Sequence, residues 1–206
     1  KYAWEQGLAK DIMPHAPKTY ETWSNCKKAV IGGRAQCFKP GKHEGKYVFL
    51  DVKSMYPYVM TNRVFPCGQE TPTDTYVHNK CGLYLVDVHF QQLPLIVPRR
   101  DPNPQVALDW NFTGAQEKIW LCSVDIEMLW RYYGMESCTV HTGFFWQNDT
   151  RTLFNCMLQW KKVKQHQDEI KGSSEYNPAL RQISKLLLNS LSGKVSQRIF
   201  EKRKVF

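Results

Sequence analysis

The stretch FLDVKSMYPYVM, residues 49–60, constrains this chain more than any other. It begins as an apolar run of the kind that forms a buried strand, and the run ends at the carboxylate of Asp51. Two residues with hydroxyl groups, Ser54 and Tyr56, follow shortly after. A carboxylate at the end of a strand can hold a metal ion beside a phosphorylated substrate, whereas a structural protein gains little from it. The stretch therefore predicts an enzyme site.

The segment NPALRQISKLLLNSLSGK, residues 177–194, predicts a helix with two different faces. Asn177 is expected to cap its start, Pro178 to take the first helical position and Gly193 to end it. Side chains four residues apart share a face, which gives one polar and one apolar stripe. The polar stripe is Arg181, Lys185 and Asn189, and the apolar stripe is Leu180, Ile183, Leu187 and Leu191. Two cations and an amide can bind a phosphate chain, and the alternative is a solvated polar face.

The charge and the cysteines narrow the class of protein. The formal net charge of +9 favours an anionic partner, most simply nucleic acid, although a basic domain without such a partner has the same charge. Seven cysteines are spread along the chain without a CxxC pair, which argues against a structural zinc site or a disulfide scaffold and favours a reducing, intracellular compartment. No apolar stretch approaches the roughly 18 residues of a membrane span. Because the sequence lacks an initial Met, we interpret it as an internal piece of a longer polypeptide.

The other segments alternate irregularly between strands and helices. Strands are expected at 47–52, 82–90 and 137–147, helices at 113–134 and 149–171, and loops or Pro-broken segments at 63–75 and 93–105. Residues 29–38 are interpreted as two short strands or as a strand and a loop, with their adjacent glycines either in a plain turn or where another backbone comes close. This order predicts an α+β fold around a mixed or antiparallel sheet.

Two motifs become specific in combination. DVKSMYP (51–57) resembles DxxSLYP, motif A of the family B DNA polymerases, and KLLLNSLSG (185–193) resembles their motif B, KxxxNSxYG, in the same order. IGGR (31–34) and RVFPCG (63–68) resemble segments of the protein-primed subgroup, which starts replication from a terminal protein. The resemblance implies a polymerase that extends DNA by two-metal nucleotidyl transfer, in the protein-primed replication of a viral or mobile-element genome.

The resemblance also implies a role for each matching residue. It makes Asp51 and Lys185 catalytic, with Mg²⁺ bound by the Asp51 carboxylate and the Val52 carbonyl. The residues implied to bind the incoming dNTP are Ser54, Met55, Tyr56, Arg181, Lys185 and Asn189, and those implied to bind DNA are Gly32, Gly33, Arg34, Ser190, Gly193 and Lys194. The implied partners are a DNA primer–template, dNTPs and a terminal protein, without a membrane. Such an enzyme would act in a host nucleus or cytoplasm, or in an organelle if encoded by a plasmid.

A polymerase of this kind implies an order of domains. An upstream segment with the two glycines is expected at 1–46, and palm motif A at 47–62. Palm and an insertion similar to a terminal-protein region are expected at 63–148, and the fingers region with the motif B helix at 149–206. The implied fold is α+β, with a palm-like sheet, packed helices and a fingers helix at the C-terminal end.

The chain departs from the family pattern at three points. Ser192 replaces the tyrosine of motif B, and Val30 replaces the tyrosine of the YxGG motif. Motif C, the acidic hairpin that supplies a second metal-binding aspartate, is not found, so we expect this chain alone to be inactive. One alternative is a polymerase-derived remnant that binds DNA or a protein without catalysis. Another is an unrelated basic α+β domain in which Asp51 is a buried structural acid; Asp87, at a similar strand position, lacks a flanking motif.

Overall fold

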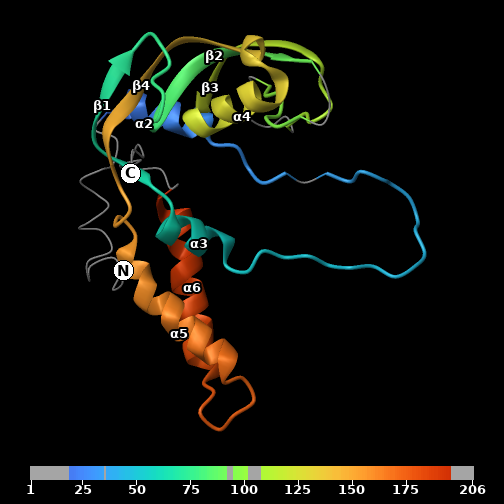
Figure 1. The fold of residues 1–206 in the computed structure, drawn as a ribbon. Helices are drawn as coiled ribbons and strands as arrows, with labels where there is room; N and C mark the ends of the chain where they lie inside the picture. Colours follow the sequence, from blue (N-terminus) through green and yellow to red (C-terminus); the bar gives the residue numbers. More distant parts are fainter. Residues whose placement is uncertain (1–18, 35, 92–94, 102–107, 196–206) are drawn as a thin grey trace, which may run out of the picture. The chain divides into compact units, whose positions relative to one another are not determined.

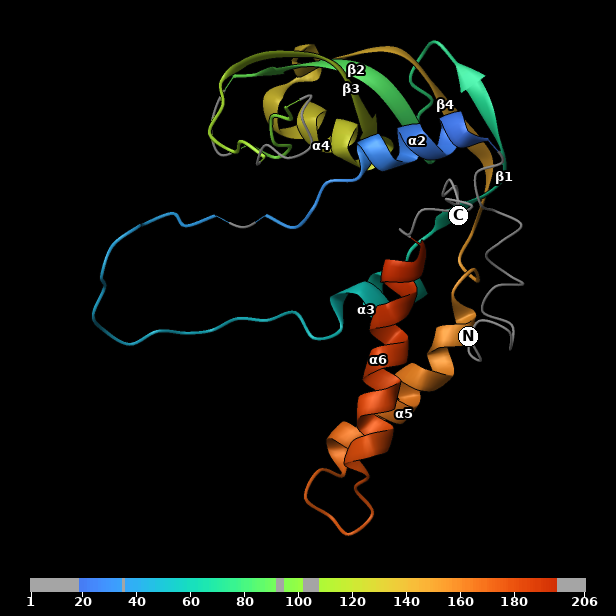
Figure 2. The same cartoon turned by 180° about the vertical axis from the view of Figure 1, so that it is seen from behind.

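A computed structural model describes residues 19–34, 36–91, 95–101 and 108–195, with side chains up to Gly193. The described chain forms two compact units, each built from two separate stretches of sequence. Residues 19–30 and 64–153 form the first, which we call the sheet unit. Residues 31–63 and 154–195 form the second, which we call the helical unit. Figures 1 and 2 show the elements of both units from opposite sides.

The sheet unit is built on four antiparallel strands. In chain order they are β1 (Phe65–Thr73), β2 (Gly82–Phe90), β3 (Gly114–Cys122) and β4 (Cys138–Thr150), and their order in the sheet is β1-β4-β2-β3. The strands predicted at 82–90 and 137–147 are confirmed as β2 and β4. The predicted α+β class is confirmed as well, and the sheet is antiparallel rather than mixed.

β1 corrects the prediction of a loop at 63–75. Pro66 and Pro72 lie in an edge strand, where a missing N–H costs no ladder hydrogen bond. The pairing of β1 with β4 also shifts register between Cys67 and Glu70, and Gly68 lies within this bulge at φ +83°. Pro and Gly therefore mark the bulged edge of the sheet rather than a loop.

The prediction of a helix over 113–134 is wrong for the first half of this segment. Residues Gly114–Cys122 form β3, and only α4 (Ser123–Tyr133) is helical, with Gly134 at its end as predicted. β3 pairs with β2, and alternation buries Ile119 and Leu121. The start of α4 is marked by Asp125, whose carboxylate accepts hydrogen bonds from the backbone N–H and the thiol of Cys122.

Helices contribute to both faces of the sheet. α2 (Tyr20–Ala29) is preceded by its N-cap Thr19, whose hydroxyl oxygen accepts a hydrogen bond from the N–H of Thr22. Ala29, the last residue of α2, packs in a buried cluster with Leu83 of β2 and with Phe144 and Trp146 of β4, on one face of the sheet. On the opposite face Tyr84 lies fully buried against Tyr76, and Tyr76 contacts Trp130 of α4 edge to face. The core of this unit thus lies on both faces of its central strand β2.

The helical unit contains α3 (Met55–Asn62), the 3₁₀ turn η4 (Asn155–Met157), α5 (Leu158–Glu169) and α6 (Pro178–Val195). α5 and α6 lie side by side in both views (Figures 1 and 2). The predicted cap is confirmed, because the Asn177 side chain accepts the N–H of Leu180 at 3.0 Å. Two boundaries were wrong: α5 starts later than 149, since β4 continues to Thr150, and α6 runs past Gly193.

The apolar stripe predicted for α6 is only partly buried. Leu191 is buried, but Ile183 is 50 % exposed. Leu188, one position away from the predicted stripe, is buried instead, as is Ser184, whose hydroxyl bonds to the carbonyl of Leu180. The buried line of the helix is therefore rotated from the predicted one, because α5 and α3 cover a different strip of its surface.

The segment that precedes α3 has no regular secondary structure. The strand predicted at 47–52 and the strands predicted within 29–38 are absent from the described residues. Phe49 is 97 % exposed and Leu50 is 92 % exposed, so this apolar run is not buried. A strand requires a neighbouring strand for its hydrogen bonds, and none of the described strands pairs with this segment.

No helix in the described part of the chain is both long and apolar enough to cross a lipid bilayer.

Candidate functional site

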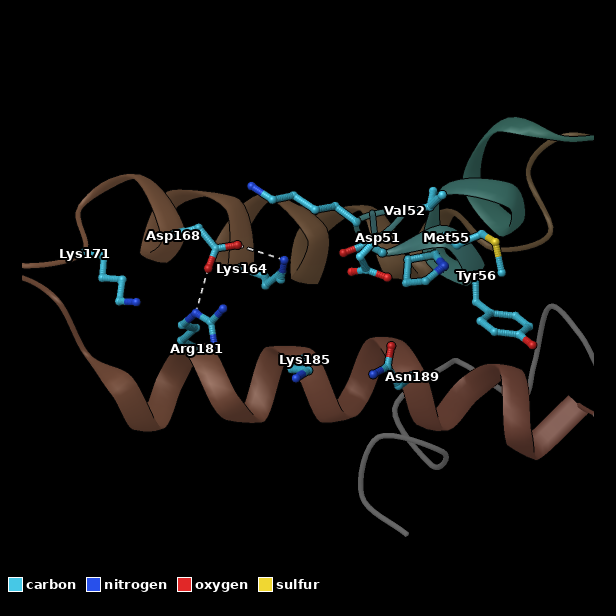
Figure 3. A pocket seen from close by; sticks show the side chains of 13 residues that line it. Asp51, Val52, Met55, Tyr56, Lys164, Asp168, Lys171, Arg181, Lys185 and Asn189 are labelled. Carbon is cyan, nitrogen blue, oxygen red and sulfur yellow. Dashed lines mark hydrogen bonds and ion pairs between the residues drawn. The ribbon is translucent and has the colours of Figure 1, made fainter. Parts of the chain in front are cut away.

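A pocket of about 760 Å³ lies within the helical unit. Its wall combines the turn leading into α3 with residues of α5, of the segment after α5 and of α6, and Figure 3 shows it from close by. The lining residues are Asp51, Val52, Lys53, Ser54, Met55, Tyr56, Pro57, Lys164, Asp168, Lys171, Arg181, Lys185 and Asn189. Two motifs that are far apart in the sequence thus meet at one cavity.

The turn into α3 has an unusual backbone. Ser54 lies in the left-handed region at φ 52° and ψ 42°, which is uncommon for a residue other than Gly. It is the N-cap of α3, and its carbonyl accepts the N–H of Tyr58 at 2.9 Å. The N–H groups of the first helical turn, including those of Met55 and Tyr56, have no acceptor within the helix. This end of α3 can therefore bind an anion.

The polar stripe of α6 faces the pocket. Arg181, Lys185 and Asn189 all line it, as their spacing predicted for a shared face. In Figure 3, Asp51 and Tyr56 lie toward the Asn189 end of this row. Lys185 and Asn189 are exposed, and neither side chain forms a hydrogen bond or ion pair with the described residues. Their polar groups are thus available to a ligand.

α5 supplies pocket residues that the sequence analysis did not identify. Asp168 pairs with Lys164 at 2.8 Å and with the Nε of Arg181 at 2.6 Å (Figure 3). Hydrogen bonds from Lys164 and then Arg181 hold the pKa of Asp168 below its usual value, and Asp168 raises the pKa of Arg181. The available signal was the i,i+4 pair of Lys164 and Asp168, which on its own indicates only a stabilised helix.

The pocket is electropositive overall. Its lining contains five cationic side chains and two carboxylates, Asp51 and Asp168. Asp168 is neutralised by its two partners, whereas Asp51 is exposed and makes no hydrogen bond or ion pair with the described residues. Asp51 is thus not a buried structural acid. The arrangement can hold a polyanion, with one carboxylate left for a metal ion.

Several predicted site residues lie outside the pocket. Gly32, Gly33 and Arg34 belong to the exposed segment before α3, and Arg34 bonds to Gln36 at 2.7 Å. Ser190 and Gly193 lie on α6 but do not line the cavity, and the side chain of Lys194 is outside the described residues. The structure therefore brings together the residues predicted for the metal and the dNTP, but not those predicted for DNA.

The carboxylate of Asp87 belongs to the sheet unit and is fully engaged there. It accepts the backbone N–H of Lys118 at 2.8 Å and pairs with His141 at 2.8 Å. Burial alone would raise the pKa of Asp87, but these two partners lower it. Among the described residues, no group of three or more His, Cys, Asp and Glu side chains is arranged to hold a metal ion.

The hydroxyl of Ser192 turns back onto its own helix, where it bonds to the carbonyl of Asn189 at 2.8 Å. Asn189, whose backbone carbonyl accepts this bond, lines the pocket.

Comparisons with known proteins identify the family. The family profile "DNA polymerase type B, organellar and viral" matches residues 3–206. The DNA polymerase of Bacillus phage Nf is 25 % identical over 162 residues, which cover 74 % of this chain and 27 % of that protein. The DNA polymerase of Bacillus phage phi29 is 24 % identical over 204 residues, which cover 91 % of this chain and 31 % of that protein. The chain thus spans about a third or less of the length of these relatives.

A solved structure shows the same fold. It is phi29 DNA polymerase in complex with primer–template DNA and incoming nucleotide substrates, and it aligns with a TM-score of 0.67 at 20 % identity. The alignment covers 92 % of this chain and 35 % of that chain. The predicted resemblance is confirmed by the family match over nearly the whole sequence, and the chain belongs to the type B DNA polymerases of organelles and viruses.

Proposed function

We propose that this chain is the nucleotide-binding part of a DNA-directed DNA polymerase, and that its pocket binds the incoming dNTP. The observation that carries the proposal is that Asp51 of motif A and Lys185 of motif B line one electropositive cavity. A triphosphate carries several negative charges, so a pocket with an excess of cations and an exposed carboxylate suits it and its metal ion. The family membership favours this function over the non-catalytic remnant, because the matched phage relatives are named DNA polymerases.

Six of the lining residues have a proposed task in nucleotide binding. Lys185 and Arg181 bind the phosphate chain as cations, while the N–H groups of Ser54 and Met55 at the start of α3 donate to it. Tyr56 forms a wall beside the sugar and excludes a 2′-hydroxyl by its bulk. Asn189 also lines the pocket, and its proposed task is to contact the bound nucleotide.

A divalent metal fits the donor set at the start of the turn. Asp51 has a carboxylate without a competing partner among the described residues, and Val52 adds a backbone carbonyl, so both offer the hard oxygen ligands of Mg²⁺. Asp168 is unsuitable because two cations already hold it. A bound Mg²⁺ would neutralise charge on the phosphates and activate the primer 3′-hydroxyl. The proposed two-metal reaction requires a further carboxylate, since Asp51 is the one unpaired acid that the described pocket provides.

The remaining assignments are proposals drawn from the family. The solved phi29 complex contains primer–template DNA and nucleotides, and we assign corresponding partners to this chain. Gly32, Gly33 and Arg34, together with Ser190, Gly193 and Lys194, are proposed to contact DNA. The domain order given above, the fingers role of α6, the insertion within 63–148 and priming by a terminal protein belong to the same proposal.

Isothermal titration of a Mg²⁺–dNTP complex into the protein with bound primer–template tests the function. The unchanged protein should bind saturably and only with the metal. Asp51→Ala and Lys185→Ala should each weaken binding at least tenfold, because a lost charged interaction with the ligand costs about 1.5–3 kcal/mol.

Lys162→Ala is the matched control. Lys162 is an exposed lysine of α5 outside the pocket lining, so Lys162→Ala changes the net charge by the same amount as Lys185→Ala. It should leave nucleotide affinity within about twofold. DNA binding that weakens with salt but shows no response to nucleotide would refute the proposal.

A further inference from the structure

Asp168 occupies an unexpected position for a pocket that binds phosphates. One of its carboxylate oxygens pairs with Lys164 at 2.8 Å, and the other pairs with the Nε of Arg181 at 2.6 Å. Figure 3 shows the carboxylate between these two cations, at the Arg181 end of the pocket. A negative group at this place repels the ligand and occupies two of the cations that would otherwise bind it.

The burial of these cations gives a reason for the carboxylate. The side chain of Lys164 is 14 % exposed and that of Arg181 is 31 % exposed. Both cations are less accessible to water than the exposed lysines of the pocket, and the Asp168 carboxylate supplies a counter-charge to both. The other three cations of the pocket, Lys53, Lys171 and Lys185, are exposed to water, and none of them makes an ion pair with the described residues.

We infer that Asp168 is the internal counter-anion of the pocket. It forms ion pairs with Lys164 and Arg181 until the phosphate chain of the ligand displaces it from these two cations. The inference rests on the proposed function, because it takes the ligand to be a triphosphate. Asp168 is thus a positioning residue that sets nucleotide affinity by competition. The exposed lysines Lys53, Lys171 and Lys185 are open to the phosphate chain at once, whereas Arg181 becomes available only when Asp168 is displaced.

The substitution Asp168→Asn tests this competition, because it removes the charge but keeps the shape. Isothermal titration would compare the Mg²⁺ complexes of dATP and of pyrophosphate. Both should bind about fivefold more tightly to Asp168→Asn, since one partly exposed ion pair is worth up to about that factor. A residue with only a structural role would instead weaken binding when replaced. Should Asp168→Asn fail to fold by circular dichroism, Asp168→Ser provides the second variant.

Glu169→Gln is the matched control, since Glu169 is an exposed acid next to Asp168 and does not line the pocket. It alters net charge equally and should leave both affinities within about twofold. A second readout is the coupling between Asp168 and Arg181. Arg181→Ala should weaken nucleotide binding only slightly in the natural background, but by about fivefold more when Asp168 is Asn.

The outcomes distinguish a failure of the counter-anion inference from a failure of the proposed function. If the natural protein binds dATP but Asp168→Asn binds it equally or more weakly, the counter-anion inference is wrong and the proposed function stands. The same follows if Glu169→Gln tightens binding as much as Asp168→Asn. If neither Mg²⁺–dATP nor pyrophosphate binds the natural protein at all, the proposed function fails, and the inference fails with it.

Discussion

The cap at the start of α6 allows a prediction with a definite sign and size. Asn177→Ala removes the side-chain oxygen that accepts the N–H of Leu180 at 3.0 Å. The backbone N–H of residue 177 remains, so its bond to the side chain of Gln167 at 2.7 Å is retained. The first turn of α6 contains no acidic residue that could replace the cap. The effect of the substitution is therefore confined to the lost cap.

The magnitude follows from the exposure of the site. Replacing an N-cap by Ala costs about 0.5–2 kcal/mol, and because Asn177 is exposed, water replaces part of the lost bond. We expect a loss of about 0.5–1 kcal/mol in the local stability of this turn. That corresponds to hydrogen exchange about two- to fivefold faster at the Leu180 amide. The effect should fade toward Asn189, at the other end of the polar stripe.

Asn177→Asp is the matched comparison. It keeps the acceptor and adds a negative charge at the positive end of the helix dipole, which stabilises by about 0.3–1 kcal/mol. Exchange at Leu180, measured by NMR, should therefore be slower than in the natural protein. Equal exchange rates in the Ala, Asp and natural proteins would refute the assignment of this cap.

Three further predictions concern stability. The cationic partners of Asp168 lower its pKa, so the ionised acid stabilises the fold above its unfolded pKa of about 3.9. That stability is lost as the pH falls through the lower folded pKa. Below about pH 4, the urea midpoint of Asp168→Asn should therefore fall less steeply with pH than that of the natural protein. Gly143→Ala should destabilise the sheet unit by more than about 1 kcal/mol in urea unfolding, because the added Cβ would overlap the carbonyl oxygen of Leu83 and approach the Cα of Tyr84 at 2.9 Å. Gly193→Ala should instead raise stability by up to about 1 kcal/mol, since it lies inside α6 with no atom within 4 Å of the new Cβ, and a loss of helix content by circular dichroism would contradict this.

Local sequence signals were sufficient to predict an element whose hydrogen bonds and burial pattern can be read from its own segment. The cap, the first-turn proline and the period of residues 177–194 placed α6 almost completely, because a helix makes its hydrogen bonds within one segment. β2 was equally clear, since its alternating side chains are buried on a central strand. The stripe of Arg181, Lys185 and Asn189 followed from helical spacing alone.

The errors arose where distant partners decide the structure. β1 carries Pro and Gly that look like loop residues, and only its position at the sheet edge beside β4 makes them acceptable. β3 has the composition of the helix that follows it, and its pairing with β2 selects the strand. The apolar run at 47–52 shows the reverse case, because hydrophobic character alone does not supply a partner strand.

The pocket shows the same limit. Motif spacing led to the α6 stripe and to Asp51, but Lys164, Asp168 and Lys171 carry no motif. Their membership follows from the packing of α5 along α6, which no local pattern specifies. The pairing of Asp168 with Arg181 likewise could not be predicted from the sequence, since the two residues belong to different helices.

The helical unit is interrupted in the sequence, because the stretch 64–153 of the sheet unit separates α3 from α5. On the ribosome, the turn with Asp51 is synthesised first and must wait until α6 has emerged before the pocket can close. The entropy of closing such a long loop rises slowly with its length, so lineages can lengthen or shorten 64–153 at little thermodynamic cost to the pocket.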